Sequence, residues 1–456
     1  MTHTLNSRFT LVAFVAILIL TSTASAEWKE KVLYSFQGGT DGAYPAGGVV
    51  FDKQGNLYGA TQQGGADNCS PMAACGTVYQ LSPPGHKGGA WTETILHVFK
   101  GKASNDGEFP AGGVIADASG NIYGTTSYGG TGDCVLLGIK GGCGTVYEFS
   151  PPGTEGGAWT YAILYSFKGG NDGYLPNGDL VFDSVGNLYG STAFGGGKGT
   201  TCDPGYYQYC GTVFKLSPPK TKGGKWTEEV LHSFAGGSDG GNPNGGLVLD
   251  GKGAIYGTTY IGGNEGGACG SEGCGTIFQL KRPNEKGGAW TETVLHRFST
   301  SGDGGGPAAG VAFGRNEGLY CTTVGGGVGN SPWGTVVQLV IDSNGKWKER
   351  LLHSFKDGDD GSEPRSGVVF DAKGNIYGTA SGGGTSGGGT VFRMQPEGDS
   401  WSFTILYHFT ASPDGFYPVG GLVFGGAEAL YGVTQYGGSA QACGHYGCGT
   451  VFMTMP

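Results

Sequence analysis

The chain has 456 residues, of which 97 are glycine, and it carries a formal net charge of −10. This acidic balance disfavours nucleic acid and anionic membranes as partners, because both are bound mainly through clustered positive charge. The glycines recur at fixed positions beside β-branched and aromatic residues, which indicates a turn-rich β protein rather than a disordered or collagen-like chain.

The first 26 residues have the features of a secretory signal peptide. Arg8 gives a short positive start, residues 9–20 form an apolar run, and Ala24-Ser25-Ala26 is a small-residue cleavage site. Cleavage there leaves residues 27–456 with 26 basic and 37 acidic side chains, a formal charge of 26 − 37 = −11. No long apolar run follows, so we expect a secreted or periplasmic protein without a membrane span.

One unit recurs seven times in the remaining chain. The copies begin at Trp28, Trp91, Trp159, Trp226, Trp290, Trp347 and Trp401. Each copy contains four short strand signals in the order Trp-x-Glu-x-Val-Leu-(Tyr/His)-x-Phe, Gly-Gly-Leu-Val-Phe-Asp, Asn-Leu-Tyr-Gly-Thr-Thr and Gly-Thr-Val-Phe-x-Leu. The pattern predicts an all-β, seven-bladed β-propeller with four-stranded blades, formed by residues 27–456 as a single domain.

The phase of the repeat predicts how the ring closes. The chain begins with a Trp strand at 28–36 and ends with Gly449-Thr450-Val451-Phe452, one strand short of a full unit. We expect Gly-Gly-Leu-Val-Phe-Asp to be the innermost strand and the Trp strand the outermost. The N-terminal strand then completes the last blade and pairs beside Gly449–Met453.

This strand order separates the loops into two groups. Tight hairpins such as Asp52–Asn56 lie on one face. The inter-blade Asp-Gly loops and the long loops that end at Cys-Gly-Thr lie on the other. Because the second face carries the longer and more variable loops, we expect it to be the functional one.

Ten of the eleven cysteines fall in pairs inside the long loops. An exported protein permits disulfides, and each loop has too few ligands for zinc, so we predict local bridges. The predicted pairs are Cys69–Cys75, Cys134–Cys143, Cys202–Cys210, Cys269–Cys274 and Cys443–Cys448. Cys321 replaces the glycine of Tyr-Gly-Thr-Thr, and we expect an inert core thiol there.

An aspartate precedes glycine in every inter-blade loop. Seven carboxylates around a channel could hold calcium or a cationic ligand. Every blade needs a chain reversal at this point, however, so a turn role is favoured, and we expect no cofactor or metal. The seven are Asp41, Asp106, Asp172, Asp239, Asp303, Asp360 and Asp414.

Four histidines occupy one repeated position. His97, His232, His296 and His353 stand where other copies have tyrosine, as at Tyr34. Side chains on the outer strands of different blades cannot converge on one metal or substrate. We therefore interpret them as packing residues and predict no catalytic residues among them.

Aromatic residues at the ends of strands and in the long loops are the candidate ligand-binding residues. Flat rings with a polar edge suit stacking on sugars or gripping a peptide, and packing of loop over loop is the alternative. The candidates are Tyr128, Phe194, Tyr206, Tyr207, Tyr260, Trp333 and Tyr436.

The unit Leu-Val-Phe-Asp-x-x-Gly-Asn-Leu-Tyr-Gly-Thr-Thr, followed by Cys-Gly-Thr-Val-Phe-x-Leu, resembles the GloVer (Gloeo-Verruco) tandem repeat of bacterial exported proteins. The resemblance covers residues 28–456 and implies an exported, often surface-anchored protein of unknown biochemical activity. The chain ends with its last strand, at 452–456, where members of this family often carry an anchoring tail, so we expect free secretion or periplasmic residence, as a monomer.

Two functions of different class fit these observations. The first is a binding or adhesion module for an extracellular polysaccharide or protein. The second is a lyase or glycoside hydrolase acting on an extracellular polymer. The sevenfold aspartate counts against the enzyme, since a catalytic pair should be unique. Glu108 and Glu363 are the nearest candidates for a unique channel carboxylate, and the scattered arginines are not expected at the inner rim.

Overall fold

The computed structural model describes most of the chain beyond the predicted signal peptide 1–26, which lies outside the described residues. The described ranges are 27–65, 75–136, 139–154, 156–197, 210–221, 223–263, 269, 272–285, 287–300, 302–328, 332–410 and 412–456. Within these ranges the helices are short 3-10 turns, and none is long and apolar enough to cross a membrane.

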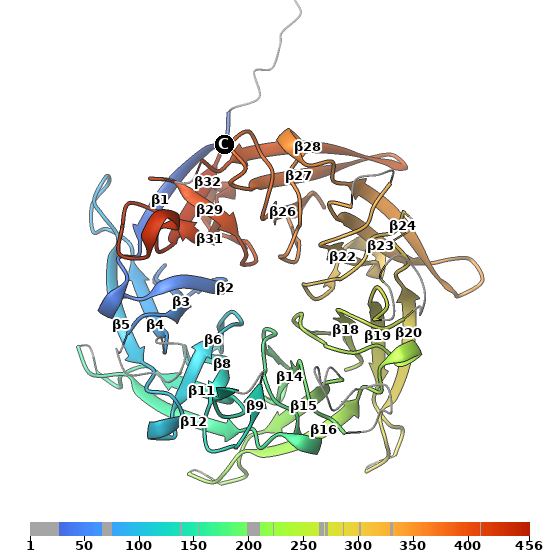
Figure 1. The fold of residues 1–456 in the computed structure, drawn as a ribbon, viewed down its shortest axis with the longest axis horizontal. Helices are drawn as coiled ribbons and strands as arrows, with labels where there is room; N and C mark the ends of the chain where they lie inside the picture. Colours follow the sequence, from blue (N-terminus) through green and yellow to red (C-terminus); the bar gives the residue numbers. More distant parts are fainter. Residues whose placement is uncertain are drawn as a thin grey trace, which may run out of the picture.

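Seven antiparallel sheets stand around a common axis, which confirms the seven-bladed β-propeller (Figure 1). In the part of the chain that the structure describes, each blade has the predicted strand order from the axis outward. The innermost strands are β2 (Ala43–Phe51), β6 (Gly107–Pro110) with β7 (Ile115–Ala116), β13 (Val181–Phe182), β17 (Val248–Leu249), β21 (Ala312–Phe313), β25 (Val369–Phe370), and β29 (Gly415–Pro418) with β30 (Val423–Phe424).

The two middle strands of each blade are the most buried. The second strands are β3 (Leu57–Gln63), β8 (Ile122–Gly129), β14 (Leu188–Thr192), β18 (Ile255–Thr259), β22 (Leu319–Thr323), β26 (Ile376–Ala380) and β31 (Leu430–Gly437). The third strands are β4 (Thr77–Ser82), β11 (Thr145–Ser150), β15 (Thr212–Ser217), β19 (Thr276–Lys281), β23 (Thr335–Ile341), β27 (Thr390–Glu397) and β32 (Thr450–Met455). Their runs of apolar residues on both faces reflect a sheet that is covered on both sides.

The Trp strands form the outer edge. They are β5 (Thr92–Val98), β12 (Thr160–Ser166), β16 (Thr227–Ser233), β20 (Thr291–Arg297), β24 (Trp347–Ser354), β28 (Ser400–His408) and β1 (Lys29–Ser35). As predicted, β1 pairs antiparallel with β32, from Lys29 opposite Met455 to Ser35 opposite Thr450. Figure 1 shows this blue strand lying along the red C-terminal blade. The ring is thus closed by backbone hydrogen bonds between the two ends of the chain.

Eight 3-10 turns and one small hairpin complete the described elements. The hairpin joins β9 (Val135–Leu136) and β10 (Ile139–Lys140) in the long loop of the second blade. The turns are η1 (Gly39–Asp41), η2 (Lys102–Ser104), η3 (Gly170–Asp172), η4 (Gly237–Asp239), η5 (Arg315–Glu317), η6 (Gly358–Asp360), η7 (Gly426–Glu428) and η8 (Gly444–Tyr446).

The core consists of apolar clusters between neighbouring blades. Phe36, at the end of the first Trp strand, is fully buried, and its ring lies 5.1 Å from that of Tyr79 in the next blade. At Gly59, opposite Tyr79, an added Cβ would come within 2.3 Å of the Tyr79 hydroxyl. The glycine of Tyr-Gly-Thr-Thr therefore makes room for this aromatic ring.

Cys321 occupies this glycine position in the fifth blade. The residue opposite it is Val337 rather than an aromatic residue. The smaller partner leaves space for a side chain. The residue is 1% exposed and unbridged, and burial raises the pKa of its thiol to about 12, so the predicted core position is confirmed.

A second repeated contact joins each blade to the next on the long-loop face. The residue before each inter-blade proline has a positive φ, and its N–H donates to the carbonyl at the cysteine position of the preceding blade. At the ring closure, Tyr44 has φ 57° and its nitrogen lies 2.8 Å from the carbonyl oxygen of Cys448. A left-handed conformation is unfavourable for a residue with a side chain, so the surrounding contacts must impose it.

Candidate functional site

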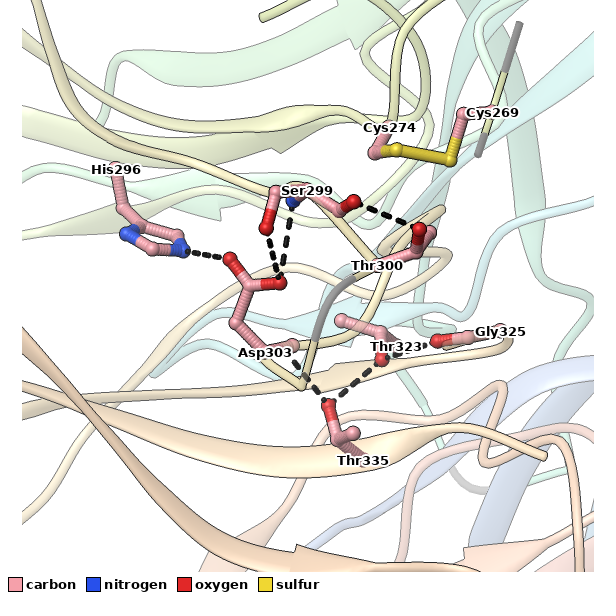
Figure 2. A network of polar contacts seen from close by, with 9 residues as sticks. All are labelled: Cys269, Cys274, His296, Ser299, Thr300, Asp303, Thr323, Gly325 and Thr335. Atoms are coloured by element: carbon pink, nitrogen blue, oxygen red, sulfur yellow. Dashed lines mark hydrogen bonds and ion pairs between the residues drawn. A yellow bond between two sulfur atoms is a disulfide. The ribbon is translucent and has the colours of Figure 1, made fainter. Parts of the chain in front are cut away.

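The seven aspartates do not surround the channel. Each carboxylate is bonded inside its own loop, near the end of an outer strand. In the fifth blade, Asp303 accepts from the backbone nitrogen of Ser299 at 3.2 Å and from its hydroxyl at 2.9 Å, and His296 Nε2 lies 3.2 Å away (Figure 2). Burial opposes ionisation, but these partners lower the pKa of Asp303 below its usual value.

The same arrangement recurs around the ring. Asp41 accepts from the Tyr34 hydroxyl at 2.6 Å, and Asp360 lies 3.1 Å from His353 Nε2. We call the seven aspartates with their tyrosine or histidine partners the Asp rim. These carboxylates are bonded within their turns and do not form the ring around the channel that the calcium alternative required. The repeated histidines pack as predicted, and each also has its Nε2 close to an aspartate, with hydrogen bonds at His97 and His353, which the sequence reasoning missed.

A second carboxyl lies beside several members of the Asp rim. Glu93, on the outer strand of the next blade, accepts from the Tyr34 hydroxyl at 3.1 Å. Burial, and then the neighbouring Asp41 carboxylate, raise the pKa of Glu93 to about 9. Burial and the charge of Asp414 likewise raise the pKa of Glu30 to about 8. Glu93 thereby links two blades, and neither glutamate lines the channel cavity.

Disulfides hold several of the long loops. The predicted bridges Cys134–Cys143, Cys269–Cys274 and Cys443–Cys448 are formed. Cys75 and Cys210 are also disulfide-bonded. Their predicted partners, Cys69 and Cys202, lie outside the described residues.

The candidate aromatic residues fall into different environments. Tyr206 and Tyr207 lie outside the described residues. Phe194 is 8% exposed and packs on Tyr174, with 5.3 Å between ring centroids. Trp333 is half-buried against the core between the fifth and sixth blades. Both side chains thus have packing contacts, as the alternative interpretation expects.

Tyr128 and Tyr260, two of the remaining candidates, point to opposite faces of their sheets. Tyr128 is half-buried and contacts Phe109, with 6.1 Å between ring centroids. Tyr260 lies one residue earlier in its repeat than Tyr128, so its side chain points to the opposite face of the sheet. An added Cβ at Gly306 would come within 3.1 Å of the Tyr260 ring. Tyr128 also packs against the core cluster that contains Tyr174 and Phe194.

Tyr436 is different, because four other rings surround it. The ring centroids of Tyr44, Phe416, Tyr417 and Tyr446 lie 5.4, 6.0, 5.9 and 5.8 Å from that of Tyr436. We call these five residues the aromatic mouth. Tyr446 is 66% exposed, and its ring stacks at 15° to that of Phe416. The other four are half-buried.

The aromatic mouth is assembled from segments far apart in the sequence. Tyr44 begins the first blade, whereas Phe416, Tyr417 and Tyr436 belong to the last blade. Tyr446 lies in η8, inside the loop closed by Cys443–Cys448. Of these five residues, the sequence reasoning identified only Tyr436.

An arginine continues this surface toward the axis, against expectation. Arg365 lines the central channel, its guanidinium carbon lies 5.7 Å above the ring of Tyr417, and its Nη2 donates to Glu363 Oε2 at 2.7 Å. A cation over an aromatic face is attracted by the ring quadrupole. The expectation that no arginine reaches the inner rim is therefore wrong.

The central channel is a cavity of about 610 Å³ bounded by the innermost segments of all seven blades. Its wall is mostly glycine and aliphatic side chains, with a few amides. Asn177 accepts from the Ser127 hydroxyl at 2.6 Å and donates to Asn244 at 3.1 Å. Across the ring closure, Gln435 donates to Gln62 at 3.1 Å. This volume is within the range of small-molecule sites, about 300–1,000 Å³.

Asp179 is the carboxylate of the channel wall, and the sequence reasoning missed it. The two expected candidates are placed elsewhere, because Glu108 is 4% exposed in β6 and Glu363 is bound by Arg365. Asp179 lines the cavity, and its Oδ1 accepts from the backbone nitrogen of Gly113 at 2.5 Å. Enclosure by protein raises its pKa. The signal was available, because the other six repeats have glycine at this position.

The comparisons with known proteins agree with the repeat and the fold. The Gloeobacter/Verrucomicrobia repeat matches residues 19–202, 134–327 and 267–456. The chain belongs to this repeat family. No curated protein sequence matches it.

The similar solved structures are distant. A protein of unknown function from Dyadobacter fermentans is 12% identical over 83% of this chain and 98% of its own, with a TM-score of 0.43. A candidate 6-phosphogluconolactonase from Bacteroides uniformis is 12% identical over 78% and 84%, with a TM-score of 0.47. A gluconolactonase from Xanthomonas campestris is 12% identical over 94% and 89%, with a TM-score of 0.40. No function is transferred from them.

Proposed function

We propose that this repeat-family propeller is an exported binding module that holds a polysaccharide at its aromatic mouth. The observation that carries the proposal is the group of five rings around Tyr436, with Tyr446 largely exposed. Aromatic rings with polar edges bind sugars by stacking on their apolar faces and by hydrogen bonds from their hydroxyl groups. The mouth occurs once in the described ring, whereas the scaffold beneath it repeats.

The surroundings of the aromatic mouth support a preformed site. Tyr436 lies on a buried sheet, and the loop that carries Tyr446 is closed by the Cys443–Cys448 bridge. Rings that are already held in place lose less conformational entropy when a ligand binds. The disulfides are compatible with an extracellular location, as the predicted signal peptide requires.

The repeat provides a matched test. Tyr436→Ala and Tyr446→Ala remove rings of the aromatic mouth. Tyr128→Ala removes a half-buried tyrosine from the position equivalent to Tyr436 in the second blade. A glycan array with oxidised residues 27–456 first identifies the bound glycans, and calorimetry then gives the affinity of each variant.

We expect each mouth variant to lower the affinity at least about tenfold, equivalent to about 1.4 kcal/mol of binding free energy. Tyr128→Ala should change the affinity less than about twofold. Equal losses in all three variants, or glycan binding that none of them alters, would contradict the placement of the site. Binding of proteins but no glycan would overturn the polysaccharide and favour a protein ligand.

A second candidate function is cleavage of an extracellular polymer, as a lyase or glycoside hydrolase. The observation that favours it is Asp179, a carboxylate found in one blade and facing the channel. Glycoside hydrolysis usually requires two carboxyl groups, and Arg365 already binds Glu363. Product analysis by mass spectrometry on each bound glycan separates the two functions, because a binding module returns the polymer uncut.

A further inference from the structure

We propose that the channel behind the aromatic mouth is a binding site for a sugar unit that bears a primary ammonium, with Asp179 as the residue that binds the charged group. The proposal rests on the proposed function, because it specifies the glycan that enters from the mouth. It predicts a glycan of free hexosamine units rather than a neutral or acidic one.

Asp179 and Arg365 are the charged side chains that line the cavity. Arg365 is paired with Glu363, so its charge is already compensated. None of the described residues forms an ion pair with Asp179. The channel therefore contains one carboxylate without a counter-charge.

The carboxylate of Asp179 is held by the backbone and is open to the cavity. Oδ1 accepts from Gly113, and the side chain is exposed to the cavity. Protein nevertheless encloses the site, and the resulting loss of hydration raises the pKa of Asp179. An enclosed carboxylate gains most from a charged donor, because charge-assisted hydrogen bonds are roughly twice as strong as neutral ones.

The acceptor positions of Asp179 favour an ammonium over a sugar diol. A vicinal diol is best held by both oxygens of a carboxylate at once. Here Gly113 already donates to Oδ1, so Oδ2 is the oxygen that keeps both of its acceptor positions open to a ligand. A single ammonium suits this arrangement. The amides of Asn177 and Asn244, which line the same cavity, can bond to hydroxyl groups of the sugar.

The net charge of the protein and the position of Asp179 favour a cationic polysaccharide. The protein has a formal net charge of −10, which repels acidic polymers and attracts cationic ones. The aromatic mouth accepts the apolar face of a sugar whatever its charge. Selectivity for an amino sugar must therefore come from the channel. Asp179 replaces the glycine that the other six repeats have at this position, so the scaffold does not require it.

The test compares two probes that differ at the nitrogen: a hexamer of β-1,4-linked glucosamine and its fully N-acetylated form. Calorimetry at pH 6 and low salt measures both with wild-type residues 27–456. Asp179→Asn removes the charge, and Asp179→Gly restores the repeat consensus and should fold. Asp359→Asn, at an exposed aspartate of η6, changes the net charge equally outside the channel.

We expect the wild-type protein to bind the amino hexamer at least about tenfold more tightly than the acetylated one. Both Asp179 variants should remove this preference and leave the affinity for the acetylated hexamer within about twofold. Asp359→Asn should change neither affinity. An unchanged preference in the Asp179 variants, or no preference in the wild-type protein, would overturn the inference.

Failure of the inference and failure of the proposed function have different signatures. If glycans bind and the mouth variants weaken them, but Asp179 has no effect on the amino probe, the inference alone is wrong. If no glycan binds and the mouth variants change nothing, the proposed function is wrong and the inference is rejected with it.

Discussion

The Asp rim and the aromatic mouth belong to the same loops but differ in how they repeat. At the rim, every blade has an aspartate that is bonded to backbone and to a tyrosine or histidine, as at Asp41 and Asp303. Two and three residues further on, the last blade has Phe416-Tyr417, whereas the fifth has Gly305-Gly306. The backbone at the second of these positions is the same, with φ 63° at both Tyr417 and Gly306.

This difference separates what the fold needs from what a ligand could use. A residue that is the same at one position in all seven blades has a structural role that every blade requires. Such a role is a chain reversal or a contact with the neighbouring blade. A side chain that changes on an unchanged backbone is free of that need. Arg365 and Asp179 are of the second kind, since the other blades have different residues at these positions, and the tyrosine of Tyr417 is shared only with Tyr44 of the first blade.

The largest expected effect comes from disrupting the scaffold that both regions share. Gly275 has φ 94°, and an added Cβ would lie 2.4 Å from the carbonyl oxygen of Thr259 and 2.6 Å from Pro307 of the next blade. Gly275→Ala should lower the free energy of unfolding by about 3 kcal/mol or more, because it adds overpacking to a left-handed backbone. Chemical denaturation followed by fluorescence measures this change.

The control for this variant is Gly358→Ala. Gly358 has φ 57°, and an added Cβ would have no atom within 4 Å. Its loss should be about 1–2 kcal/mol, from backbone conformation alone. Equal losses in the two variants would show that the contact between the glycine and the next blade's proline is not what fixes this position.

An intermediate effect is expected from the Asp rim itself. Asp303→Ala removes the acceptor from the backbone and hydroxyl groups of Ser299 and the partner of His296. We expect a loss of about 2–3 kcal/mol, since a partly buried loop loses the carboxylate that accepts from its backbone and from a hydroxyl group. Tyr446→Ala at the aromatic mouth should stay within about 0.5 kcal/mol. The distinction between rim and mouth fails if both variants are equally destabilised.

A pH dependence is also expected at the rim. Glu93 has an ordinary pKa of 4.5, and its folded-state pKa is raised to about 9. Folding therefore favours the protonated form, and this contribution is complete below pH 4.5 and is lost as the pH rises through about 9. Glu93→Gln stays neutral, so its melting temperature should rise relative to the wild-type protein between pH 5 and pH 9.

Calorimetric melting at pH 5, 7 and 9 gives this comparison. Glu397→Gln, at an exposed position in β27, serves as the control and should follow the wild-type protein at every pH. A difference between Glu93→Gln and wild type that does not change with pH would mean that Glu93 is ionised in the folded protein.

Much of the fold could be predicted because the same strand and turn patterns occur seven times in the sequence. The Trp strand at the start and the missing strand at the end predicted the pairing of β1 with β32. The short spacing of Cys134 and Cys143 predicted their bridge. Repetition also favoured the turn role of the aspartates over a calcium site, because every blade must reverse its chain.

The candidate site was harder to predict, because it consists of departures from the repeat. Asp179 could have been noticed as a charge at a glycine position, but its place on the channel wall depends on which face of the inner segment meets the axis. The close approach of His296 to Asp303 is local in the sequence, but it depends on how the end of the strand and the turn are placed relative to each other.

By itself, the sequence determined the repeat, the blade order, the ring closure and the three disulfide pairs that the structure describes in full, because these follow from hydrophobic period, turn residues and cysteine spacing. Only the tertiary structure decided that Tyr44 and Tyr436 meet and that Asp179 is the uncompensated carboxylate of the channel. Ring closure brings the first and last blades into contact. The sequence separation of two residues therefore does not indicate their distance in the folded protein.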